Sequence, residues 1–187
     1  MQPRQLIDFL AIIGKLKRNT RHVWSADGRH ESVAEHCWQL SVMALLVADE
    51  FPDVDINKVV KMCLIHDFGE AITGDIPGFN KTKQDEENEE LAIVDLLKQL
   101  PEGISNEFTE LFSEMAELKT TEAKLTKALD NLEVLVAHNE SPMDTWIELE
   151  YSANLTYGTE NVAFSDYLKK LKEEIKRDSL QKIAKEA

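Results

Sequence analysis

Hydrophobic residues recur every three or four positions through most of the chain, which is the spacing of one buried face of a helix. Strict alternation of hydrophobic and polar residues, the pattern of a half-buried strand, is scarce. Ser32 followed by Glu35 is a capping-box signature and predicts where one of the helices begins. The predicted helices cover approximately residues 5–16, 32–50, 57–72, 85 to the break at Pro101, 106–118, 121–138 and 165–187.

Two segments between the predicted helices are polar or rich in turn residues. Residues 17–30 are polar and irregular and contain an Asp-Gly turn signal, and residues 75–82 form a loop. No internal repeat, low-complexity linker or change in composition divides the chain. We therefore predict an all-α protein with one domain over residues 1–187, a core over about residues 8–170 and a C-terminal helix over residues 165–187.

The composition is that of an acidic globular protein, with 187 residues, 43% hydrophobic content and a net charge of −14. So acidic a surface disfavours nucleic acid and anionic membranes as partners. No hydrophobic run reaches the roughly 20 residues that a membrane span needs, and Asp8 interrupts the N-terminal run, so no signal peptide is indicated. Cys37 and Cys63 lie in hydrophobic stretches without a CxxC pattern, which favours buried, reduced thiols and a cytoplasmic location.

An adjacent histidine and aspartate, His66 and Asp67, lie within an otherwise hydrophobic stretch. Taken alone, such a pair is more often a helix-surface pair than a metal site. Within a hydrophobic stretch, however, the pair needs a partner charge, because burying unpaired charges is costly. A divalent cation would supply it, since imidazole nitrogen and carboxylate oxygen suit Mn, Co, Fe, Ni or Zn. Glu70 follows on the same helix face, where an acid can take the proton of an attacking water.

Two further residues are polar groups in hydrophobic surroundings. His36 lies in the first turn of a strongly hydrophobic helix, although a lone histidine there is more often a packing residue. Asp130 lies in a helix that is hydrophobic almost all round, where a carboxylate needs a cation or several donors. One site built from these two residues and the adjacent His-Asp pair would satisfy all four, and would leave positions open for water and substrate.

Three segments of the chain resemble one family. Residues 31–36, 66–77 and 127–132 are similar to the motifs of the HD-domain phosphohydrolase superfamily, and in particular of its 5′-deoxynucleotidase branch. That branch includes the bacterial YfbR-type enzymes and the HD-domain-containing protein 2 group. The resemblance extends over about residues 8–170 and rests on the combined motifs, because the bare His-Asp pair is not specific. It implies an HD-domain helical bundle with a metal site between core helices.

The resemblance also implies roles for individual residues. The metal ligands would be His36, His66, Asp67 and Asp130. Glu70 and Asp75 match the acids that activate water and protonate the leaving oxygen, although Asp75 could also be a turn or capping residue. The residues that contact the nucleoside would be Asp75, Ile76, Pro77 and Gly78. The cofactor would be one divalent transition metal, Co or Mn, with Fe, Ni, Zn and Cu as alternatives.

A basic segment precedes the first histidine of this pattern. Five of the 21 lysine and arginine residues lie within residues 15–29, where Asp27 is the one acid. This suits a phosphate monoester, which carries about two negative charges, although a solvated basic loop is the alternative. The resemblance matches Arg21 to an arginine that contacts the substrate phosphate, with Lys81 as a weaker candidate. The bacterial enzymes have a tryptophan directly after that arginine, which screens the sugar for a 2′-hydroxyl; here Trp24 could do the same or simply pack.

These features lead to the hypothesis that the protein hydrolyses a nucleoside 5′-monophosphate, with the deoxy form favoured. Another phosphomonoester or a cyclic nucleotide is an alternative substrate, whereas a triphosphate is disfavoured because the cations are too few. The alternative of a different class is a non-catalytic, acidic helical interaction module with a structural metal. The family commonly forms homodimers, and four late residues supply either hydrophobic surface for this or core packing. These are Trp146, Leu149, Tyr151 and Tyr157.

Overall fold

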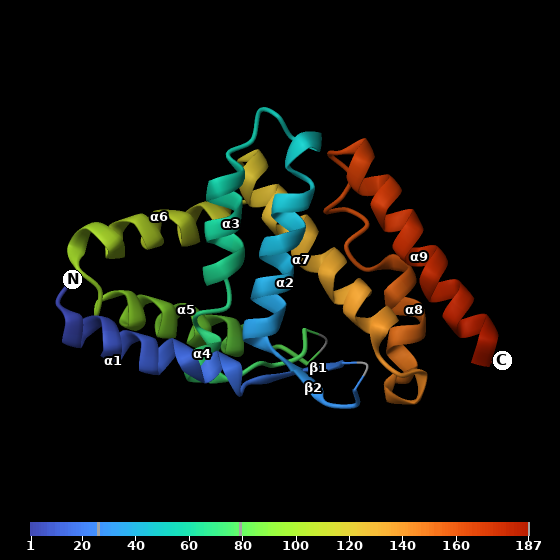
Figure 1. Cartoon of the computed structure of the whole chain (residues 1–187), viewed down its shortest axis with the longest axis horizontal. Helices are drawn as coiled ribbons and strands as arrows, with labels where there is room; N and C mark the ends of the chain where they lie inside the picture. Colours follow the sequence, from blue (N-terminus) through green and yellow to red (C-terminus); the bar gives the residue numbers. More distant parts are fainter. Residues whose placement is uncertain (26, 79, 187) are drawn as a thin grey trace.

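In a computed structural model, which describes residues 1–25, 27–78 and 80–186, the chain folds into helices with one small antiparallel sheet, and the predicted all-α class is confirmed (Figure 1). The helices are α1 (Pro3–Ile13), α2 (Val33–Leu46), α3 (Ile56–Ile65), α4 (Glu70–Thr73), α5 (Lys83–Leu97), α6 (Glu102–Glu117), α7 (Thr121–Glu140), α8 (Glu148–Thr156) and α9 (Asp166–Glu186). The strands are β1 (Thr20–Trp24) and β2 (His30–Ser32). The 3₁₀ turns are η1 (Gly14–Lys17), η2 (Ala48–Glu50) and η3 (Met143–Thr145).

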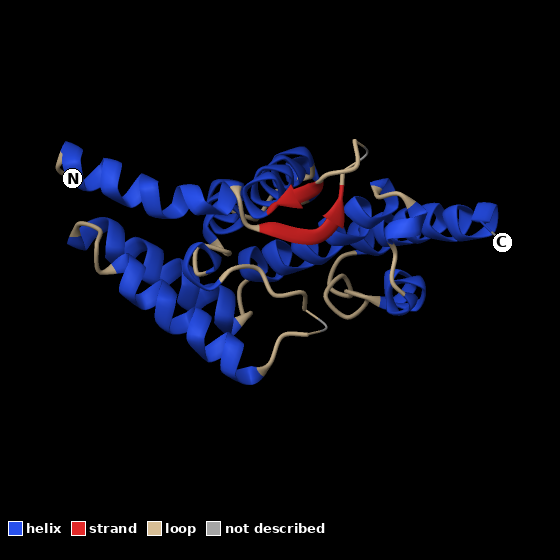
Figure 2. Cartoon of the chain, turned by 90° about the horizontal axis from the view of Figure 1, so that it is seen from below, coloured by secondary structure: helices blue, strands red, loops and turns tan. Residues whose placement is uncertain are grey.

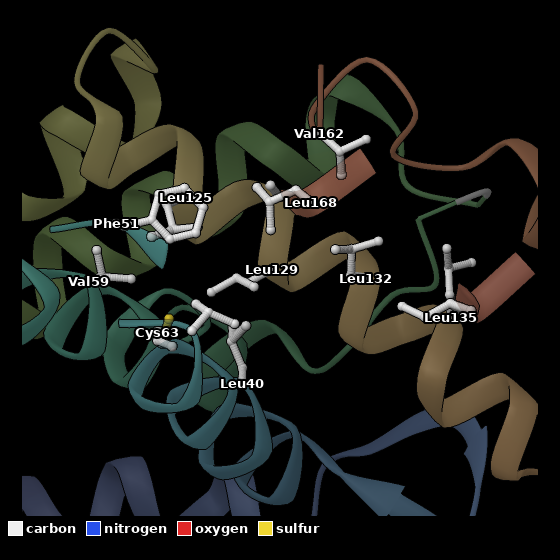
Figure 3. Packing of buried hydrophobic residues seen from close by; sticks show 14 residues of the cluster. Leu40, Phe51, Val59, Cys63, Leu125, Leu129, Leu132, Leu135, Val162 and Leu168 are labelled. Atoms are coloured by element: carbon white, nitrogen blue, oxygen red, sulfur yellow. The ribbon is translucent and has the colours of Figure 1, made fainter. Parts of the chain in front are cut away.

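Helices α2, α3 and α7 pack together at the centre of the molecule, and α9 packs along α7 on its other side (Figure 1). Leu40 of α2, Leu129 of α7 and Leu168 of α9 are fully buried in one cluster, which Figure 3 shows from close by. Burying each such side chain contributes about 1.5–3 kcal/mol. This core therefore holds α7 between its neighbours, and with it the polar residues Asp130 and Glu133 in the middle of that helix.

A second hydrophobic cluster joins α1, α5 and α6 to the turn that follows α3. Phe68, in that turn, packs edge-on against Phe9 of α1 and Phe108 of α6, with ring centroids 6.2 Å apart in both pairs. Edge-to-face aromatic pairs add about 0.5–1.5 kcal/mol to the burial of the rings. Phe68 thus anchors the turn that contains the adjacent His66 and Asp67.

The segment 17–30, predicted to be irregular, instead begins with the last residue of η1 and forms most of a β-hairpin (Figure 2). β1 pairs antiparallel with β2, with Thr20 opposite Ser32 and Trp24 opposite His30 and an irregularity in the register between them. The strands are too short for hydrophobic alternation to stand out, which is why the sequence pattern missed them. The expected turn is present, and Gly28 adopts the positive φ of +83° that favours glycine.

The helix predicted over residues 57–72 is interrupted. α3 ends at Ile65, and a turn leads into the short α4 at Glu70. Gly69 allows this turn to approach α5 closely, because a Cβ atom there would lie 3.1 Å from the backbone oxygen of Glu89. The interruption turns His66 and Asp67 towards α7, so that the break in the helix helps to build the site.

The other predicted elements need smaller corrections. The capping box of Ser32 and Glu35 is confirmed at the start of α2. A second capping box, at Thr82, was not predicted, and with it α5 begins two residues before the predicted start at residue 85. α6 also begins earlier than expected, and α8 was not predicted. Trp146 is buried rather than part of a hydrophobic surface. Cys37 and Cys63 are buried and free, as predicted, and within the described ranges no helix is long and apolar enough to cross a membrane.

Candidate active site

Four side chains from three parts of the fold converge at one point: His36 on α2, Asp130 on α7, and His66 and Asp67 in the turn after α3. His36 Nε2 lies 3.3 Å from both His66 Nε2 and Asp130 Oδ1. Asp67 Oδ2 lies 3.1 Å from His66 Nε2 and 3.8 Å from His36 Nε2. Donors at about 2.1 Å from one ion lie about 3.0–3.4 Å from one another. The ligand atoms of His36, His66 and Asp67 all lie within 4.8 Å of one another, which suits one metal ion. Asp130 lies outside that group, although its Oδ1 is 3.3 Å from His36 Nε2.

The hydrogen bonds of the two imidazole rings support the same conclusion. His36 Nδ1 donates to Glu133 Oε2 at 2.5 Å, and His66 Nδ1 donates to the backbone oxygen of Cys63 at 2.9 Å. In the neutral form that binds a metal, each ring with its Nδ1 as the donor would present an Nε2 lone pair to the other ring. Two lone pairs facing each other across 3.3 Å repel, and a cation between them removes the repulsion. The donor set therefore fits a divalent metal.

The carboxylates of this group are held in their charged form. Burial alone would raise the pKa of Asp67, but the neighbouring His66 outweighs it and lowers that pKa to about 2. Burial likewise opposes ionisation of Asp130, but Lys127, whose Nζ lies 2.9 Å from Asp130 Oδ2, keeps the pKa of Asp130 well below its ordinary value. Both side chains are thus ready to bind a cation without first losing a proton.

Two further acids lie beside the donors. Glu70 is buried at the start of α4, and its Oε2 has no hydrogen-bond partner in the part of the chain that the structure describes. Burial and the charges of nearby acids, with Asp67 first among them, raise the pKa of Glu70 to about 9. Burial also raises the pKa of Asp75. Acids with raised pKa values beside candidate metal donors are suited to exchanging protons near neutral pH.

Arg21 is fixed at the edge of the site by two acids. Its Nη1 donates to Glu31 Oε2 at 2.7 Å and to Glu133 Oε2 at 3.2 Å. Burial alone would lower the pKa of Arg21, but Glu133 and Glu31 raise it further above its ordinary value. Glu133 therefore links Arg21 to His36, although sequence reasoning missed it. The missed signal was a second charge in the hydrophobic helix that had already pointed to Asp130.

A cavity of about 530 Å³ contains most of these residues. Of the candidate metal-binding, catalytic and substrate-binding residues, those that line it are Arg21, His36, Asp67, Glu70, Asp75, Ile76, Pro77, Gly78, Lys81 and Asp130. His66 instead lines a larger and more hydrophobic cavity of about 680 Å³ between α5, α6 and α7, which Lys127 and Asp130 also border. The four candidate metal donors thus lie between the two cavities, and the charged residues concentrate in the smaller one.

Two candidates for substrate contact lie differently from what was expected. Trp24 does not line the charged cavity of the described residues but borders a separate one of about 170 Å³. Its ring stacks on His30, opposite it in the hairpin, with centroids 3.9 Å apart. His30 Nδ1 in turn donates to the backbone oxygen of Arg21 at 3.0 Å. Trp24 therefore contacts the residue that helps to fix the backbone at Arg21. Lys81 does line the charged cavity, where it forms an ion pair with Glu89.

The fold is a helical domain whose core brings together a histidine, an adjacent His-Asp pair and a distant aspartate, and these side chains suit a divalent cation. A family model described as "HD domain" matches residues 13–172. The chain belongs to this HD domain family.

Known proteins place it more closely within that family. The 5′-deoxynucleotidase HDDC2 of Bos taurus is 36% identical over 141 residues, which are 73% of this chain and 68% of that protein. A crystal structure described as a predicted metal-dependent phosphohydrolase from Magnetospirillum magnetotacticum is 27% identical, with a TM-score of 0.79 over 95% of this chain and 92% of that one. An HD phosphohydrolase of cyanophage S-2L, bound to dA and one catalytic Zn²⁺, has a TM-score of 0.59 over 94% and 96% of the two chains. At 17% identity, this last likeness shows the fold alone.

Proposed function

We propose that this protein is a metal-dependent hydrolase that removes the 5′-phosphate from nucleoside monophosphates, preferentially the deoxy forms, to give nucleoside and phosphate. The observation that carries the proposal is a cavity in which three of the four proposed metal donors, two acids and a fixed arginine meet, with the fourth donor, His66, at its edge beside His36. The name of the relatives at up to 36% identity, 5′-deoxynucleotidase, supports the same reaction.

The residues that would hold the ion are His36, His66, Asp67 and Asp130. Bound there, a divalent ion supplies Lewis-acid chemistry, because it polarises a phosphoryl oxygen and makes water more acidic. Two imidazoles and two carboxylates suit several borderline divalent metals. We assign Co or Mn as the native ion, with Fe, Ni, Zn and Cu as alternatives that a metal panel separates.

The substrate phosphate would bind beside Arg21. Glu31 and Glu133 hold the guanidinium group through Nη1, and its other N–H groups are donors of the geometry that suits phosphate oxygens. Lys81 and Lys127 also line the cavity and add positive charge in a chain whose net charge is −14. This local concentration of cations offsets the charge of a monoester dianion, which the overall surface would repel.

Proton transfer would fall to Glu70 and Asp75, which line the same cavity. One acid takes the proton of the attacking water, and the other donates a proton to the leaving 5′-oxygen. The loop of Ile76, Pro77 and Gly78 forms the wall next to Asp75, and we assign the nucleoside contacts to it. Trp24 then acts on the substrate indirectly, through His30 and the backbone of Arg21.

Phosphate release from a panel of ribo- and deoxyribonucleoside 5′-monophosphates tests this function. Purified protein loaded with Co²⁺ or Mn²⁺ is expected to hydrolyse dAMP or dGMP faster than AMP or GMP. Asp67→Ala is the matched control: it removes a metal ligand, so turnover should fall to background while circular dichroism still shows a helical fold. Metal-loaded wild-type protein that is inert on every nucleotide, cyclic nucleotide and sugar phosphate would contradict the enzymatic function.

The remaining expectations concern the state of the protein in the cell. We propose a one-domain, cytoplasmic homodimer that binds neither nucleic acid nor membranes. Leu149 and Tyr157 are exposed on or near α8, but both also line the active-site cavity. Light scattering of the purified protein measures the oligomeric state, and a monomeric mass at micromolar concentration would contradict the dimer.

A further inference from the structure

A second group of polar side chains lines the same cavity, at a distance from the metal donors. His22 comes from β1, His138 from α7, and Glu150 and Asn154 from α8. None of them has a part in the chemistry proposed above. They come from three elements that meet only in the folded protein, so no sequence motif joins them.

The contacts within this group leave one acceptor and one donor available. Glu150 is 3% exposed; its Oε2 accepts the backbone N–H of Ile147 at 2.8 Å, which leaves Oε1 for another partner. Asn154 is 1% exposed, and its Oδ1 accepts a hydrogen bond from His138 Nδ1 at 2.8 Å. Neither Glu150 Oε1 nor Asn154 Nδ2 has a hydrogen-bond partner within the described ranges. Because buried polar groups are rarely left unpaired, these two atoms point to a bound partner.

The nearest imidazole groups do not complete the cluster. Glu150 Oε1 lies 3.4 Å from His138 Nε2 and 3.5 Å from His22 Nε2, which are longer than normal hydrogen bonds. The cluster is also not among the groups of described residues whose ligand atoms all lie within 4.8 Å of one another, as one metal ion would require. An organic ligand that carries both a hydrogen-bond donor and an acceptor fits it better than a second cation does.

The position of the cluster identifies the part of the substrate that reaches it. His138 follows Asp130 by eight residues on the same helix, so it lies about 12 Å further along α7. The face of α7 that lines the cavity consists of Lys127, Asp130, Val134, Leu135 and His138. A distance of this size is comparable to the span of a nucleoside monophosphate from its phosphorus to the far edge of its base. With the phosphate at the proposed metal donors, the base would extend towards His138, whose Nδ1 donates to Asn154 Oδ1 and whose Nε2 lies 3.4 Å from Glu150 Oε1.

We propose that Glu150 and Asn154 form a subsite for the nucleobase, with His138 as the residue that orients Asn154; this inference rests on the function proposed above. Glu150 Oε1 accepts from an N–H of the base, and Asn154 Nδ2 donates to the neighbouring ring nitrogen or carbonyl. Adenine, guanine, cytosine and thymine all place a donor beside an acceptor on the Watson–Crick edge. The subsite thus detects that a base is present while tolerating each of the four.

Glu150→Gln separates this role from a structural one. Glutamine retains one oxygen for the Ile147 N–H but places an NH₂ donor where the acceptor Oε1 was. The measured quantity is the ratio of kcat/KM for dAMP to kcat/KM for deoxyribose 5-phosphate, which has no base. Because a charged acceptor is lost, we expect this ratio to fall by about ten- to a hundredfold. Wild-type protein should show a similar loss with the monophosphate of unsubstituted purine deoxyriboside, which lacks the exocyclic donor.

Glu148→Gln is the matched control, since it removes the same charge from an exposed position in the first turn of α8. It should leave the ratio at the wild-type value. If wild-type protein hydrolyses nucleotides and Glu150→Gln leaves the ratio unchanged, the subsite is wrong and the proposed function stands. If Glu150→Gln lowers both kcat/KM values equally, Glu150 is structural and the subsite is also wrong. Wild-type protein inert on all nucleotides would overturn both proposals.

Discussion

Glu133→Gln should weaken metal binding without removing any metal donor. Glu133 is fully buried, and its Oε2 accepts both His36 Nδ1 at 2.5 Å and Arg21 Nη1 at 3.2 Å. Glutamine is nearly isosteric with glutamate and can still accept hydrogen bonds through its oxygen. The bonds become weaker, however, because hydrogen bonds to a charged acceptor are roughly twice as strong as those to a neutral one. His36 then becomes a less basic and less firmly oriented ligand.

The size of the effect follows from this contact. Replacing an outer partner of a metal-binding histidine typically costs 10–100-fold in metal affinity, or about 1.4–2.7 kcal/mol. Isothermal titration of metal-free protein with Co²⁺ measures the affinity, and circular dichroism checks the fold. Glu31→Gln is the control, because Glu31 accepts from the same Arg21 Nη1 at 2.7 Å but has no bond to His36. Co²⁺ affinity equal to wild type in Glu133→Gln, or equally weakened in Glu31→Gln, would refute this role of Glu133.

Two further predictions concern stability. Removing the metal with EDTA should lower the melting temperature and abolish phosphate release, and added Co²⁺ should restore both. The reason is that metal at a free concentration of 100 times its Kd stabilises the folded state by about 2.7 kcal/mol. A melting temperature unaffected by metal would contradict the metal site. Gly158→Ala should cost about 1–3 kcal/mol in urea unfolding, because Gly158 has a φ of +70° and a Cβ there would lie 2.9 Å from the Cβ of Asn131. Gly103→Ala, at a position with open space around it, is the control, and equal stability of the two variants would argue against this cause.

Local sequence determined the parts of this protein that depend on neighbouring residues. Hydrophobic periodicity predicted most of the helices, and the side chains of Ser32 and Glu35 marked the start of α2 because a capping box is formed within one turn. The four proposed metal donors were each weak candidates alone, but together they placed charges and imidazoles in hydrophobic stretches, where a shared partner makes burial tolerable. The family resemblance then predicted their common site, and the structure brings them together.

Contacts between distant residues were decided by the tertiary structure alone. Glu133 lies 97 positions from His36, the histidine that it orients. The hydrophobic periodicity of α7 could not show which other helix packs against Glu133. The short hairpin, the break at Gly69 and the displacement of Trp24 from the cavity likewise follow from pairing and close packing across the fold. Local patterns record which face of an element is buried, whereas the meeting of two faces depends on how all the elements pack.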